Sequence, residues 1–273
     1  MHGFAVRYVT TPPSGLDHVS ALIAMPLGVR NRARYGMSRT QLTRLCGKCI
    51  STTTHCNATG PLRLIDFTTL RATMVASQLR TVGVNDLSVV AAMIDVAREK
   101  FVPAGREMLA YADAAVPLGG GRAMVEPLVT GLLLTHARIT RQCRVLVIGA
   151  GTGYATALIG RLAGRVVAVE SDAALVAHAA AQGIAVQHRA LIEGAPDDGP
   201  YDVIYFDGAI ATVPAALAAQ LKPGGRAAAV VRRDGPGRVT VGRFVGDALV
   251  GETFIEVDAP LLPGFEQARE FVF

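Results

Sequence analysis

Short apolar runs alternate with helical stretches through the second half of the chain, and this alternation restricts the possible folds most strongly. The apolar runs lie at 144–149, 165–170, 201–208 and 225–233, and the helical stretches between them at 154–163, 172–183 and 214–221. Because the interior of each run is apolar without alternation, the strands are expected to be buried on both faces, as in a parallel sheet covered by helices on two sides. A short strand near 185–190 and a β-hairpin within 238–260 would complete the sheet. The sequence therefore predicts an α/β fold with a mostly parallel, seven-stranded, doubly wound sheet and a C-terminal β-hairpin.

The region before this pattern is expected to be mainly helical. Three helices are predicted from apolar spacing and capping residues, beginning after Thr68 or Thr69, after Asn85-Asp86 and after Pro127. The segment 101–127 contains several prolines and the run Gly119–Gly121, so it is expected to be a loop. Residues 65–273 are therefore predicted to form one domain, with a helical lid region at 65–141 and a sheet at 142–273.

Residues 1–64 differ from the rest in charge. They carry a net charge of +7, whereas the remainder carries −2, although the whole chain has +5. The basic character therefore belongs to an extension and not to the predicted domain, and nucleic-acid binding is not expected. The extension is expected to be poorly ordered, or to reflect a start codon upstream of a natural start near Ile65.

Metal and membrane sites are not expected. Cys46, Cys49, His55 and Cys56 could ligate zinc, but their spacing is unlike that of a zinc finger or ribbon, and free thiols are favoured. No apolar run approaches the roughly 18–20 residues that a membrane-spanning helix needs. The first residues also lack the pattern of a secretory signal. A cytoplasmic protein is the expectation.

A glycine-rich turn follows the apolar run 144–149 and is the strongest candidate for a ligand site. It consists of Gly149, Ala150, Gly151, Thr152 and Gly153. Glycine permits a tight turn and lets a ligand approach the backbone closely. Because dinucleotide-binding enzymes use similar turns, the loop alone indicates only a nucleotide ligand.

Three further features narrow the class of nucleotide. Tyr154 stands where a dinucleotide fingerprint has its third glycine. Glu170 ends the next apolar run, where a carboxylate can accept hydrogen bonds from both hydroxyls of a ribose. The sequence L-K-P-G-G at Leu221–Gly225 resembles a turn common in class I methyltransferases. Together they favour a Rossmann-like methyltransferase that binds S-adenosylmethionine, and they disfavour a nicotinamide oxidoreductase.

Short motifs spread over nearly 200 residues carry a more specific resemblance. They are Gln78-Leu79, Phe101–Pro103, Ala110–Asp113, Pro117–Gly121, Pro127, residues 145–154, Tyr201-Asp202, Pro214 and Gln220-Leu221. In this order and spacing, Val75–Phe273 resembles the protein-L-isoaspartate O-methyltransferase family. The resemblance implies a carboxyl O-methyltransferase that acts in protein repair on a protein or peptide bearing an abnormal aspartyl carboxylate. It also implies that the N-terminal helices and the segment 117–121 form a lid over the methyl donor.

The chain departs from the family pattern at several positions near the expected site. The family threonine and serine after the glycine segment fall at Ala123 and Val125, and the family T-A-A falls at 207–209. The acidic segment after the third strand falls near Ala190 and Leu191, which take the expected adenine position. The predicted cofactor-binding set is Gly149, Ala150, Gly151, Gly153, Tyr154, Glu170, Ala190, Leu191 and Asp207.

Arg122 and position 125 are the candidates for handling the substrate. In one interpretation, Arg122 replaces the lost hydroxyl donors and pairs with the substrate carboxylate through its planar guanidinium. In the other, it is a solvated loop arginine beside Glu126. Val125 also motivates a second hypothesis for the function, a divergent member that binds the cofactor but methylates a different carboxylate or none. The sequence does not predict an oligomeric state.

Overall fold

The structure is a computed structural model, and it describes residues 65–233 and 235–267. The chain divides into two units after Leu62, and the described residues belong to the second, Arg63–Phe273. The predictions for the basic extension, including its cysteines, lie outside the described residues. The division between an extension and a domain at 65 therefore stays a prediction.

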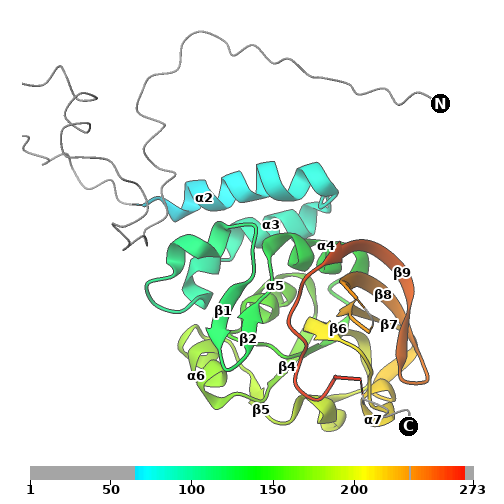
Figure 1. Ribbon diagram of the computed structural model, residues 1–273. Helices are drawn as coiled ribbons and strands as arrows, with labels where there is room; N and C mark the ends of the chain where they lie inside the picture. The colour runs from blue at the N-terminus through cyan, green and yellow to red at the C-terminus, as the bar shows by residue number, and fades with distance from the viewer. Residues whose placement is uncertain (1–64, 234, 268–273) are drawn as a thin grey trace, which may run out of the picture. The chain divides into compact units, whose positions relative to one another are not determined.

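A seven-stranded sheet forms the centre of the second unit and confirms the predicted fold class (Figure 1). Its spatial order is β5-β4-β3-β6-β7-β8-β9. The strands are β3 (Arg144–Ile148), β4 (Arg165–Glu170), β5 (Gln187–His188), β6 (Tyr201–Ile210), β7 (Leu221–Val231), β8 (Gly237–Val245) and β9 (Ala248–Val257). Neighbours are parallel from β5 to β7, and β8 and β9 are antiparallel, forming the predicted hairpin.

Helices cover the sheet on both faces. They are α2 (Phe67–Met74), α3 (Leu87–Asp95), α4 (Pro127–Ala137), α5 (Tyr154–Leu162), α6 (Ala173–Ala181) and α7 (Ala215–Ala218). Because side chains alternate along a strand, Val145 and Val147 join the core formed with α2 to α5, while Leu146 and Ile148 join a second core that includes α7. The apolar runs recognised in the sequence are therefore buried on both sides.

The start of the first helix differs from the prediction. Its N-cap is Asp66, whose Oδ1 accepts from the Thr68 amide at 3.0 Å, rather than either threonine. An aspartate at this position accepts from the first free amides as readily as a threonine does. The N-cap of α3 is Asp86, as predicted, and Oδ1 accepts from the amides of Ser88 and Val89.

The segment 101–127 is not the loop that the sequence suggested. It contains a 3₁₀ turn (Glu107–Tyr111) and a separate antiparallel hairpin, β1 (Val116–Gly119) with β2 (Arg122–Met124). The run Gly119–Gly121 makes the hairpin turn, with φ of 101°, 55° and 75°. Consecutive glycines in a sequence usually indicate a loop, but here they allow a hairpin turn that other residues rarely adopt. A further difference concerns Leu221–Gly225, which lies at the start of β7 rather than in a turn before it.

Candidate active site

The crevice between the ends of β3 and β6 is where this topology places a ligand. The chain runs outward from β3 to β4 and β5, and then returns to the other side of β3 as β6. In open α/β sheets, ligands bind outside the carboxyl ends of the strands at such a switch point. Ile148 pairs with Phe206, so Gly149 and Asp207 follow at the same level on either side of the crevice.

The loop Gly149–Gly153 turns tightly at this point. The φ angles of Gly149, Gly151 and Gly153 are 73°, 55° and 95°, values that favour glycine. The amides of Gly149 and Ala150 both donate to the carbonyl of Val169 at 3.0 Å, which fixes the loop to the end of β4. Gly153 is the N-cap of α5. The backbone of the loop is thus held in one conformation and carries no bulky side chain at three positions.

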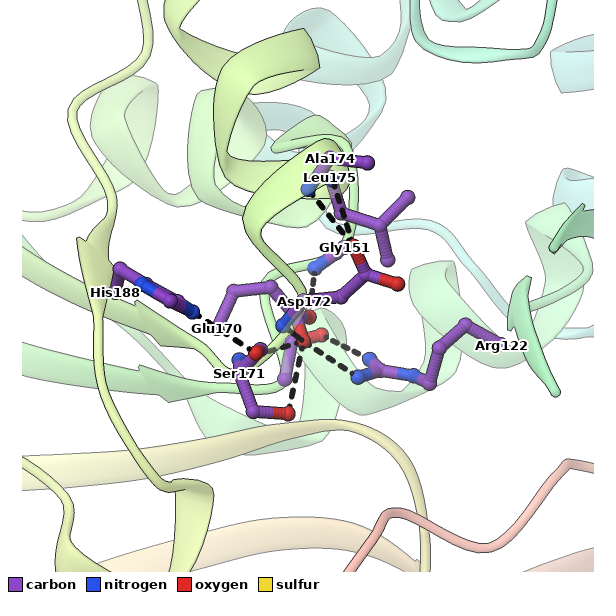
Figure 2. A network of polar contacts seen from close by, with 9 residues as sticks. Arg122, Gly151, Glu170, Ser171, Asp172, Ala174, Leu175 and His188 are labelled. Atoms are coloured by element: carbon purple, nitrogen blue, oxygen red, sulfur yellow. Dashed lines mark hydrogen bonds and ion pairs between the residues drawn. The ribbon is translucent and has the colours of Figure 1, made fainter. Parts of the chain in front are cut away.

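Glu170 ends β4 as a fully buried carboxylate beside this loop. Its Oε2 accepts from the Gly151 amide at 2.8 Å, and its Oε1 accepts from the amides of Ser171 at 2.7 Å and Asp172 at 3.1 Å (Figure 2). Such bonds to the charged form offset part of the free energy needed to bury it. The structure therefore brings Glu170 to the glycine loop, as the predicted cofactor set requires.

Arg122 reaches the same carboxylate from β2. Its Nη1 lies 2.8 Å from Glu170 Oε1 (Figure 2). Its Nη2 donates to the Gly149 carbonyl at 3.0 Å. Only 6% of Arg122 is exposed, so the interpretation as a solvated arginine beside Glu126 is wrong. The β1–β2 pairing turns this side chain toward the sheet, where a buried carboxylate pairs with it. Its role toward a substrate carboxylate stays a prediction.

Asp207 faces the crevice from β6. Burial raises the pKa of its carboxyl group to about 7, against the opposing effects of Arg122 and Arg98, while Glu170 raises it further. The residue is 8% exposed, although it lies where two arginines and a second carboxylate meet. A carboxyl group with such a pKa changes its protonation state near neutral pH.

Arg98 binds the backbone on either side of the β1–β2 hairpin, and the sequence did not predict this role. It is fully buried, and its Nε and Nη2 donate to the carbonyls of Ala110 at 2.7 Å and Val125 at 2.6 Å. Its guanidinium also lies 4.6 Å from the centre of the Tyr154 ring. In the sequence, Arg98-Glu99-Lys100 resembles an ordinary charged surface turn, so no local signal distinguishes it.

Three of the predicted site residues, Tyr154, Leu191 and Val125, have side chains in the hydrophobic cores. The Tyr154 ring is 2% exposed and packs against Phe101, with 5.6 Å between ring centres. Leu191 is also 2% exposed and joins the second core, whereas Ala190 before it is exposed. Val125 is 2% exposed, and its carbonyl serves Arg98. Cofactor or substrate roles for these residues stay predictions.

The segment 260–265 crosses the same end of the sheet, and the sequence did not predict this position either. The Ala209 amide donates to the Pro260 carbonyl at 2.9 Å, and the Leu262 amide donates to the Ala209 carbonyl at 2.8 Å. Leu262 is buried against the glycines of both strands: a Cβ atom added at Gly149 or Gly208 would lie 2.7 Å from its Cδ2. Nothing local in the sequence indicates this contact, which joins residues more than 50 positions apart.

These residues fit an adenosyl cofactor. Glu170 offers a carboxylate for ribose hydroxyls, and the glycine loop lets a ligand approach the backbone. The atoms nearest to the added Cβ positions at Gly149 and Gly151 are ends of the flexible side chains Leu118, Arg122 and Leu262. Side-chain ends of this kind can move aside for a ligand, whereas backbone could not.

Residues 65–233 and 235–267 contain no candidate metal site and no candidate membrane span. No group of three or more potential metal-binding side chains gathers there. No helix in this part of the chain has the length and apolar character needed to span a bilayer.

The sheet, its switch point, the glycine loop and Glu170 define a Rossmann-like methyltransferase, whose cofactor is S-adenosylmethionine. Comparison with known proteins gives the family. A profile described as protein-L-isoaspartate(D-aspartate) O-methyltransferase matches residues 71–241, more than half of the chain. The chain therefore belongs to the protein-L-isoaspartate(D-aspartate) O-methyltransferase family, as the sequence motifs predicted.

Individual relatives agree with this assignment. A protein-L-isoaspartate O-methyltransferase from Methylorubrum populi is 40% identical over 162 residues, covering 57% of this chain and 76% of the relative. One from Rhodospirillum rubrum is 35% identical over 198 residues, covering 68% and 90%.

Two solved structures share the fold. A protein-L-isoaspartate O-methyltransferase superposes with a TM-score of 0.61 at 23% identity, covering 74% of this chain and 67% of the other. A β-aspartate methyltransferase from Plasmodium falciparum, solved with S-adenosyl-L-homocysteine, superposes with a TM-score of 0.60 at 16% identity. This second match covers 73% of this chain and 99% of the other.

Proposed function

We propose that this chain transfers the methyl group of S-adenosylmethionine to the carboxylate of an isoaspartyl residue in a protein or peptide. The observation that carries the proposal is the family match over 71–241, which spans the glycine loop, Glu170 and the lid segment. The relatives are named for the same activity. The cytoplasmic location expected from the sequence stays a prediction.

Methyl transfer requires the protein mainly to position the two reacting groups and to exclude water. When bound, the cofactor supplies a methyl group on a positively charged sulfur, which is already a good leaving group. An ionised carboxylate needs no general base to attack it, so the protein mainly holds the two groups in line and keeps water out. In this proposal Glu170 holds the ribose, the glycine loop admits the cofactor to the backbone, and Leu118 and Leu262 exclude water.

Val125 favours a second candidate function, a family member that binds the cofactor without methylating isoaspartyl residues. The hydroxyl that the family pattern leads one to expect at this position is missing, and the residue is buried. Loss of one donor to a reacting oxygen reduces the rate by about 10²–10³ where that donor stabilises the transition state. The first candidate requires another group, such as Arg122, to replace it.

One assay separates the two candidates. The protein is incubated with S-adenosylmethionine and a peptide that contains one isoaspartyl residue, and the base-labile methyl ester is measured as released methanol. The control peptide has the same sequence with a normal aspartyl residue. Methanol from the isoaspartyl peptide alone is the expected result. Binding of S-adenosylhomocysteine by calorimetry, without methanol from either peptide, would instead establish the second candidate.

A further inference from the structure

We propose that Arg122 is a latch on the cofactor site, whose guanidinium occupies the ribose-binding carboxylate of Glu170 until the cofactor displaces it. The inference rests on the proposed function, because it assumes that Glu170 holds a ribose. It concerns a step that precedes methyl transfer, namely admission of the cofactor.

The first argument is the number of hydrogen bonds that Glu170 can accept. An ionised carboxylate has about four lone-pair sites. In the structure Oε1 accepts from Arg122 Nη1, from the amides of Ser171 and Asp172 and from the Ser171 hydroxyl at 3.4 Å, and Oε2 accepts from the Gly151 amide. These five donors already exceed the acceptor sites of the carboxylate, and a ribose diol brings two more. One of the present donors must leave before both hydroxyls can bind.

The second argument identifies which donor can leave. The amides of Gly151, Ser171 and Asp172 belong to the glycine loop and to the connection between β4 and α6, so they cannot withdraw without unfolding that part of the sheet. Arg122 comes from the separate β1–β2 hairpin. Its contact with Glu170 is made by the end of a long side chain, which can rotate away at a smaller free-energy cost.

The third argument is the second contact of the guanidinium. Arg122 Nη2 donates to the Gly149 carbonyl at 3.0 Å, and it lies 3.0 Å from the position of a Cβ atom added at Gly149. The side chain therefore covers the first glycine of the loop as well as the carboxylate. Leu262 approaches Gly149 from another segment, so both side chains cover this glycine.

The charges explain why Arg122 stays paired with Glu170. Glu170 is fully buried, and Arg122 is the cation paired with it in the described residues. A buried carboxylate without a cation is strongly unfavourable, so the ion pair stabilises the folded protein. A cofactor that replaces this pair must give up part of its binding free energy to break it. Removing the guanidinium therefore lowers the stability of the empty protein and raises its affinity for the cofactor.

The test measures binding of S-adenosylhomocysteine by calorimetry and the melting temperature of the unliganded protein. Arg122→Gln keeps a polar side chain but removes the charge. We expect it to melt at a lower temperature than the wild type without ligand and to bind S-adenosylhomocysteine at least about tenfold more tightly. Arg122→Lys keeps the charge but cannot bridge Glu170 and Gly149 at once, so its affinity is expected to lie between the two.

Two controls make the result specific to the latch. Arg71 is another largely buried arginine with a carboxylate partner, Glu99, and it lies in α2 away from the glycine loop. Arg71→Gln is expected to lower the melting temperature without tightening binding. An S-adenosylhomocysteine analogue without the two ribose hydroxyls is expected to show no gain in affinity with Arg122→Gln.

The outcomes separate the latch from the function itself. Unchanged or weaker binding by Arg122→Gln, with wild-type binding intact, overturns the latch and leaves the proposed function standing. Absence of binding in both proteins overturns both. An equal gain with the analogue that lacks hydroxyls also overturns the latch, because the competition would then not involve the ribose.

Discussion

Asp207 is an acidic residue whose ionisation is opposed by its surroundings. Its pKa is raised to about 7 because burial outweighs the attraction of Arg122 and Arg98. On the same strand, Asp202 shows the opposite effect: hydrogen bonds from the Arg144 amide and from Lys222 lower the pKa of its carboxyl group, against a raising effect of burial. The pKa values of two aspartates five positions apart on β6 are therefore shifted in opposite directions.

The raised pKa of Asp207 predicts how stability depends on pH. The folded protein binds this proton more tightly than the unfolded chain, whose carboxyl has a pKa of 3.8. The resulting stabilisation is fully present below that value and is lost as the pH rises through about 7. The wild type should lose up to about 4 kcal/mol in its free energy of unfolding in this way, and Asp207→Asn should not. The melting temperature of the variant should therefore fall less than that of the wild type between pH 5 and pH 8.

Asp202→Asn is the matched control for this prediction. In the wild type, the pKa of Asp202 is lowered, so its charged carboxylate stabilises the folded state above the unfolded pKa. This contribution is lost on acidification. At pH 8 the Asp202 variant should therefore be less stable than the wild type. Parallel melting curves for the wild type and Asp207→Asn across the pH range would contradict the assignment.

At the scale of elements, the central strands β3, β4 and β6 were predictable because each one buries both faces. Continuous apolar runs such as 144–148 have no other stable place than the inside of a covered parallel sheet. The β1–β2 hairpin was not predictable, because Gly119–Gly121 has the composition of a loop and the hairpin has only short strands. The pairing of Arg122 with Glu170 joins residues 48 positions apart, so no local pattern indicates it.

Arg98 links several of these elements, and its removal should weaken them together. It donates to carbonyls before β1 and after β2 and stacks on the first residue of α5. Arg98→Met preserves much of the volume but leaves both carbonyls without their donor. We expect the free energy of unfolding to fall by about 2–4 kcal/mol, measured by urea denaturation.

Arg161→Met is the control for Arg98→Met. Arg161 pairs with Asp95 at 3.7 Å, but its side chain is 59% exposed. Exposed pairs contribute about 0–1 kcal/mol, so this variant should be close to the wild type in urea. Equal losses in the two variants would mean that the buried contacts of Arg98 do not stabilise the fold.

For the whole molecule, the basic extension and the methyltransferase fold are expected to be independent. The compact unit Arg63–Phe273 contains all of the described core. A protein that begins at Arg63 should therefore have the melting temperature and S-adenosylhomocysteine affinity of the full chain. A protein that begins at Gly83 lacks the buried side chains Met74, Val75 and Leu79, and should melt at a clearly lower temperature. A marked loss in the first truncation would show that the extension contributes to the fold.

The side chains over the glycine loop come from segments far apart in the chain. Leu118 and Arg122 precede the loop and Leu262 follows it by more than one hundred positions, yet all three lie against Gly149 or Gly151. Such contacts form only when distant parts of the chain have been brought together. A molecule that has stopped partway through folding would lack one wall of the crevice or the other. The fraction of a preparation that binds S-adenosylhomocysteine with full affinity would thus count the molecules that have finished folding, so refolding yield could be read from a simple titration.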